Sequence, residues 1–110
     1  RIVRTERGVH PWWVVPKHHL NYFSIESMEL LLTREGFTVQ QSLATHPLET
    51  FLLAGKNYIG NHILGRTCHA RRKAFELALY KKDPDLLNDL YIGLGRARIG
   101  REFMIIAKKK

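Results

Sequence analysis

The sequence lacks the features of a secreted, disulfide-stabilised or membrane-spanning protein. Cys68 is the one cysteine among 110 residues, so no intrachain disulfide can form. The longest unbroken apolar runs, 12–15 and 103–107, fall far short of the roughly 18 residues that a membrane-spanning helix needs. Nothing resembles a secretory signal with a charged start, an apolar run and a small-residue cleavage site. We therefore expect a soluble protein in a reducing, cytoplasmic setting, with no membrane partner.

Glycine is missing where a nucleotide-binding enzyme would need it. The eight glycines include one Gly-x-Gly pair, Gly93 and Gly95, but the preceding residues 86–94 have a helical pattern. A dinucleotide fingerprint requires a glycine-rich turn that directly follows a strand. No cofactor-binding residue is therefore assigned within the chain.

Metal-ligand patterns are also missing. The six histidines and the single cysteine contain neither Cys-x-x-Cys nor His-Glu-x-x-His. No metal site is predicted, and we expect Cys68 to be a small buried thiol.

Acidic residues are scarce in the second half of the chain. Residues 1–44 hold five Lys and Arg against four acids, whereas residues 45–110 hold thirteen against six, which gives +1 and +7 of the formal charge of +8. Such an excess indicates either attraction of phosphate- or carboxylate-bearing partners or a solvated helix face with a basic tail.

The residues that follow position 23 predict a helix and then a strand. Ser24 is a suitable N-cap, apolar residues recur at helical spacing through 25–35, and Gly36 favours a left-handed stop. Apolar and polar residues then alternate over 37–44, which is typical of a half-buried strand.

From residue 46 to residue 100 the pattern becomes helical. We predict a short segment at 47–54, a long helix at 61–82 that begins either at its start or near Arg66, and a third helix opened by Asp83 and Pro84. Gly95 or Gly100 is expected to end the third helix. The apolar run 103–107 predicts a strand buried on both faces and paired with 37–44.

Polar side chains gather directly before the first predicted helix. His18, His19, Asn21 and Tyr22 place two imidazoles, an amide and a phenol in five positions. Side chains and free backbone N–H groups can converge on a small polar ligand at a helix N-terminus. This pattern indicates the rim of a binding site.

The order His-Leu-x-Tyr-Phe-Ser, amphipathic helix, Gly-Phe and strand resembles the C-terminal part of class I S-adenosylmethionine-dependent methyltransferases, over residues 12–44 and more weakly 102–107. The resemblance implies an α/β fragment, the C-terminal piece of a Rossmann-like fold, mostly helical with an antiparallel strand pair at about 37–44 and 102–107. Residues 1–110 would form one segment, with 1–44 and 101–110 associated with the sheet and 45–100 inserted as a helical cap.

The resemblance also implies the site residues and the missing parts. In sugar C-methyltransferases with this pattern, the histidine that matches His19 is the proposed base, and an acidic residue precedes it. In this sequence His18 occupies the position of that acidic residue. His19 is thus the catalytic candidate. Candidates for binding the methyl acceptor from the same part of the chain are His18, Asn21, Tyr22, Trp12, Trp13 and Lys17. S-adenosylmethionine would be bound by an N-terminal cofactor domain that this sequence does not contain, so the fragment alone should be inactive.

A second basic cluster lies in the long predicted helix. Arg66, His69 and Lys73 share one face at three-to-four spacing and are candidates for gripping an acceptor phosphate or carboxylate. Glu76 lies on the same side and offers Lys73 an alternative partner in an ion pair.

The leading hypothesis is the acceptor-side portion of a methyltransferase that acts on a small molecule. The alternative is a small basic module that binds nucleic acid or protein. The sequence contains no motif typical of nucleic-acid recognition, which makes nucleic acid the less favoured partner. We also expect the isolated fragment to self-associate, because a two-stranded sheet is marginal and an exposed edge pairs readily.

Overall fold

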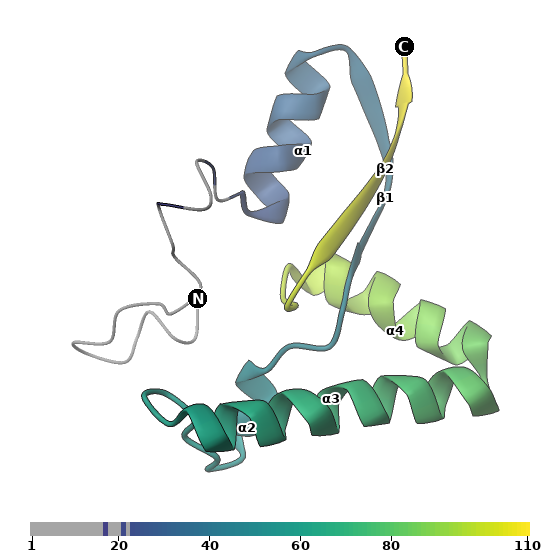
Figure 1. The fold of residues 1–110 in the computed structure, drawn as a ribbon. Coiled ribbons are helices and arrows are strands. Elements are labelled where there is room, and N and C mark those ends of the chain that lie inside the picture. The colour runs from purple at the N-terminus through teal and green to yellow at the C-terminus, as the bar shows by residue number, and fades with distance from the viewer. Residues whose placement is uncertain (1–16, 18–20, 22) are drawn as a thin grey trace.

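A computed structural model describes Lys17, Asn21 and residues 23–110. In this part of the chain the elements are α1 (Ile25–Arg34), β1 (Phe37–Ala44), α2 (Glu49–Leu53), α3 (His62–Lys82), α4 (Pro84–Ala97) and β2 (Phe103–Lys109). The two strands form an antiparallel pair, α1 lies beside it, and α3 and α4 form a helical hairpin near its other end (Figure 1). The predicted mixture of helices with one antiparallel strand pair is confirmed. None of the helices in residues 23–110 has both the length and the hydropathy of a transmembrane segment.

Helix α1 begins and ends as the sequence predicts. The Ser24 hydroxyl accepts a hydrogen bond from the Ser27 N–H at 3.2 Å, and the Ser27 hydroxyl accepts one from the Ser24 N–H at 2.9 Å. These reciprocal bonds satisfy donors that the first helical turn leaves unpaired. At the other end Gly36 adopts a φ of 86°, which is accessible to glycine at little cost.

The register of the strand pair contains one irregularity. Val39 pairs with Ala107 and Ser42 pairs with Ile105, with a shift between Val39 and Gln41. The expected strict alternation therefore fails after Val39, because an extra residue in one strand moves the following side chains to the opposite face. Ser42 consequently shares a face with Val39 and donates a 2.5 Å hydrogen bond to Glu29 of α1.

Strand β2 is less buried than the sequence predicts. Met104 is 64% exposed and Ile106 is 48% exposed, so the expectation of burial on both faces is wrong. Helices α1 and α4 pack mainly against β1, and the described elements leave the face with Met104 and Ile106 uncovered. The strand also runs to Lys109, two residues beyond its predicted end.

Both helices of the hairpin have capped N-termini, of which the cap at Asp83 was predicted. Asn61 accepts from the Leu64 N–H at 3.0 Å, and Asp83 accepts from the Leu86 N–H at 3.0 Å with Pro84 at the first helical position. The alternative start of the long helix near Arg66 is wrong, because α3 begins at His62.

Neither glycine that was expected to end α4 does so. The helix ends at Ala97, followed by Arg98 in the left-handed conformation. Gly95 is buried inside the helix, where a Cβ atom would lie 2.8 Å from the Leu43 nitrogen and closer still to the Ser42 carbonyl. Glycine is needed at this position because α4 approaches the β1 backbone closely.

Candidate functional site

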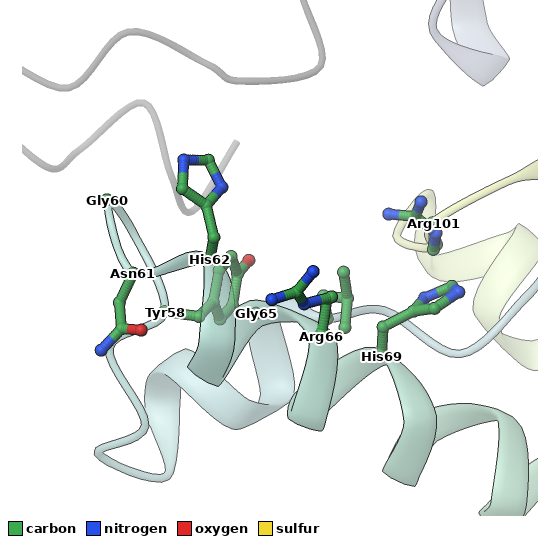
Figure 2. A pocket seen from close by; sticks show the side chains of 9 residues that line it. Tyr58, Gly60, Asn61, His62, Gly65, Arg66, His69 and Arg101 are labelled. Atoms are coloured by element: carbon green, nitrogen blue, oxygen red, sulfur yellow. The ribbon is translucent and has the colours of Figure 1, made fainter.

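A cavity of about 260 Å³ lies at the N-terminal end of α3. Its walls come from the start of α2, from the loop that leads into α3, from the first two turns of α3 and from the loop that precedes β2 (Figure 2). Leu48 and Arg101, which are 53 residues apart in the sequence, therefore line the same cavity.

The floor of the cavity is apolar. Leu48 and Tyr58 line it, and each is only 6% exposed. Both belong to a small core with Cys68, whose burial confirms the predicted buried thiol. The floor is thus built from packed side chains that are held in place by the core behind them.

The rim of the cavity is basic. His62, Arg66 and His69 line it from α3, because side chains three to four residues apart lie on the same face of a helix. Arg101 lines it from the loop before β2. Figure 2 shows Arg66 and His69 rising from α3 on the side that faces the Arg101 loop. Among the described residues that line the cavity, none is acidic.

Thr45, which directly follows β1, fixes the position of the Arg101 loop. The Arg101 N–H donates to the Thr45 carbonyl at 3.2 Å, and the Thr45 N–H donates to the Glu102 carbonyl at 2.9 Å. The Thr45 hydroxyl also accepts from the Glu102 N–H at 3.1 Å. These bonds continue the hydrogen-bond ladder of the strand pair, so the backbone of Arg101 is anchored to the sheet.

The protonation of the rim residue His69 is perturbed by its surroundings. Burial lowers the pKa of His69 below its usual 6.5, and the charges of Arg101, Arg72 and Lys73 lower it further, while Glu102 opposes them. Its Nδ1 atom is buried and has no hydrogen-bond partner among the described residues. A neutral imidazole beside two guanidinium groups can still offer a hydrogen bond to a ligand.

The structure brings together two of the predicted acceptor-binding residues, Arg66 and His69. Lys73 is exposed and does not line this cavity. The exposed Lys17 and Asn21 do not line it either. The remaining candidates lie outside the described residues: His19, His18, Tyr22, Trp12 and Trp13.

Glu76 forms an ion pair with Arg72 and not with Lys73, the partner considered from the sequence. Arg72 donates to Glu76 at 3.0 Å, four residues earlier on α3, whereas Lys73 is exposed. Residues four apart on a helix stack along one face as well as residues three apart do. Here burial decides between them, because Arg72 and Glu76 both face α4 and the core.

Tyr58 and Arg101 were not identified from the sequence. Tyr58 lies in a loop between glycines and carries no motif. The predicted pairing of the strands did contain a signal for Arg101, because antiparallel pairing of 37–44 with 102–107 brings residue 101 close to residue 45.

No family model, curated protein or solved structure matches the chain.

Proposed function

We propose that this chain is the acceptor-side portion of a class I S-adenosylmethionine-dependent methyltransferase that acts on a small molecule. The observation that supports the proposal best is the cavity formed between the helical segment inserted after β1 and the loop that leads back into β2. Such an insertion beside the last strand pair is where an acceptor site is expected from the resemblance. The strand pair would then be the C-terminal end of a Rossmann-like sheet.

The residues described here do not fit the cofactor. Gly93 and Gly95 lie inside α4, and no glycine-rich turn follows a strand in residues 23–110. A helix interior offers its N–H groups to its own carbonyls rather than to a ligand. The proposal therefore assigns cofactor binding to an N-terminal domain outside this sequence and gives this chain the task of holding the acceptor.

Orientation of the acceptor is the contribution that this chain would make. Positioning a reactant for attack lowers the barrier to transfer substantially without any chemistry by the residues that hold it. Arg66, His69 and Arg101 would hold the acceptor at the cavity rim. His19 remains the candidate for removing a proton from the acceptor, with its neighbours His18 and Tyr22 and with Asn21 as further contacts. A cytoplasmic setting belongs to the same proposal, and the free Cys68 thiol is consistent with it.

The test compares the 110-residue chain with a longer polypeptide that retains its upstream coding sequence. We expect calorimetry to show that the longer polypeptide binds S-adenosylmethionine and the short chain does not. The longer polypeptide should also transfer a radiolabelled methyl group to a dialysable molecule from a metabolite extract. Its His19→Gln variant should keep cofactor binding and lose transfer.

Three outcomes would overturn parts of this proposal. Micromolar binding of the cofactor by the short chain would refute the division into two portions. Absence of cofactor binding by the longer polypeptide would refute the methyltransferase assignment. A mobility shift of nonspecific DNA by the short chain that weakens steeply with salt would favour the nucleic-acid module instead.

A further inference from the structure

We infer that the cavity at the start of α3 binds a small organic anion, a carboxylate or phosphate group carried on an apolar skeleton, through Arg66 and Arg101. Identification of this anion as the methyl acceptor rests on the proposed function, whereas its binding rests on the cavity alone.

The shape of the cavity limits the size of the ligand. A volume of about 260 Å³ is close to the lower end of the range found for small-molecule sites. The apolar floor of Leu48 and Tyr58 gives a hydrocarbon or aromatic skeleton a surface to cover. A free inorganic ion would leave that floor without a partner.

The charges around the cavity select a negative group. Arg66 lines it from α3 and Arg101 from the loop before β2, and guanidinium groups bind the two oxygens of a carboxylate or phosphate in a fixed geometry. Glu49 and Glu102 act electrostatically on Tyr58 and His69 but do not line the cavity. Both guanidinium groups would attract an anion that binds in the cavity.

The backbone of α3 reinforces the same preference. Asn61 and His62, at the first turn of this 21-residue helix, line the cavity together with Gly60. The first N–H groups of a helix lack intrahelical acceptors and carry the positive end of its dipole. The attraction of an anion by the N-terminus of α3 adds to its attraction by the side-chain charges.

The experiment is a titration of the ¹⁵N-labelled chain by NMR at low salt with benzoate, phenyl phosphate, inorganic phosphate and benzamide. Benzamide has the skeleton of benzoate without its charge. We expect benzoate or phenyl phosphate to shift the amide signals of Leu48, Tyr58 and His69 to saturation. Benzamide should bind about tenfold more weakly, since a hydrogen bond to a charged group contributes that much.

Matched variants locate the binding. Arg66→Gln should weaken benzoate binding about tenfold, whereas Arg71→Gln should not, because Arg71 is exposed on the same helix and does not line the cavity. Gly65→Leu fills the cavity without any change of charge, since a Cβ atom there meets nothing within 4 Å, and should abolish binding. Circular dichroism confirms that each variant is folded.

Several results would overturn the inference. Equal affinity for benzamide and benzoate would exclude selection by charge. Equal losses in Arg66→Gln and Arg71→Gln would indicate nonspecific attraction, and binding of inorganic phosphate as tightly as phenyl phosphate would exclude a role for the apolar floor. Displacement of benzoate by a DNA duplex would assign the site to nucleic acid. Because no titration contains S-adenosylmethionine, these results are independent of whether the longer polypeptide is a methyltransferase.

Discussion

The hydroxyl group of Tyr91 donates a 2.7 Å hydrogen bond to Glu76, and this bond joins α4 to α3. The other carboxylate oxygen of Glu76 accepts from the Arg72 guanidinium at 3.0 Å and from the His46 backbone N–H at 2.9 Å. The side chains of Arg72 and Glu76 are only 7% and 14% exposed. One carboxylate thus connects both helices of the hairpin to the segment that follows β1.

Replacement of Glu76 should destabilise the fold strongly. In Glu76→Gln the buried Arg72 charge loses its counterion, so the free energy of unfolding should fall by about 3 kcal/mol. Tyr91→Phe should cost about 1.5 kcal/mol, because it removes one hydrogen bond to a charged group. Urea unfolding followed by circular dichroism measures both changes.

An exposed ion pair provides the control. The Arg34 and Glu35 side chains are 75% and 60% exposed at a separation of 3.5 Å, so Glu35→Gln should change stability by less than about 0.5 kcal/mol. A double variant with Arg72→Met and Glu76→Gln should recover part of the loss, since no buried charge remains. Equal effects of Glu76→Gln and Glu35→Gln would contradict the assignment.

Two glycines of α4 should respond oppositely to alanine. Gly93→Ala should stabilise by about 0.5–1 kcal/mol, because Gly93 is exposed and an added Cβ atom meets nothing within 4 Å. Gly95→Ala should destabilise by about 1–3 kcal/mol, since the methyl group would collide with the backbone of Ser42 and force α4 away from β1. Thermal unfolding of the two variants tests the pair. A gain of stability in Gly95→Ala would refute the close approach.

Some features of the fold were predicted correctly from the sequence and others were not, for physical reasons. The starts of α1 and α4 were predicted correctly because Ser24 and Asp83 act on N–H groups within three residues, so the signal is local. The start of α3 was left open between two positions because Gly65 weakens the helical pattern over its first turn. The role of Gly95 was mistaken because a glycine required by a neighbouring strand has the same appearance in sequence as a glycine that ends a helix. Exposure of β2 depends on which elements cover the sheet, and an apolar run carries no information about that.

The candidate site was predictable only in part. Helical spacing placed Arg66 and His69 on one face, and both line the cavity. Arg101 reaches the same cavity because a hairpin of two helices returns the chain to Thr45, where backbone hydrogen bonds fix its position. Such long-range closure follows from the packing of the hairpin and not from any residue spacing.

Stability should decrease as the pH falls below about 6.5. The ring of His46 lies against Phe51 and Phe75, and burial lowers its pKa, with Glu76 opposing and Arg72 reinforcing the shift. The pKa of His69 is lowered as well, so the unfolded chain takes up protons first and acid favours it. Glu29, whose pKa is lowered by hydrogen bonds from Ser42 and Arg98, adds a separate loss only below about pH 4.5.

Urea titrations between pH 8 and pH 5 measure this dependence. His46→Gln should flatten it, because the partly buried imidazole at that position is then absent. A pH dependence that is identical in the wild type, in His46→Gln and in His69→Gln would show that neither buried imidazole causes it.

An anion in the cavity should raise the pKa of His69. The negative charge would stabilise the imidazolium and offset the charges of Arg101, Arg72 and Lys73, so benzoate affinity should rise as the pH falls. NMR titration of the His69 ring protons with and without saturating benzoate measures the shift. His46 does not line the cavity, so its pKa should not change. Equal shifts for both histidines would place the anion elsewhere.

The uncovered face of β2 should drive self-association of the isolated chain. Met104 and Ile106 expose apolar side chains on a two-stranded sheet, and the outer edges of such a sheet offer unpaired backbone groups to a second copy. Sedimentation velocity should show mass that increases with concentration. A double variant with Met104→Thr and Ile106→Thr keeps strand propensity and should reduce this increase. Leu30→Gln removes an apolar side chain that is 72% exposed on α1 and should leave association unchanged. A wild-type chain that sediments as a monomer at every concentration would refute self-association through the sheet.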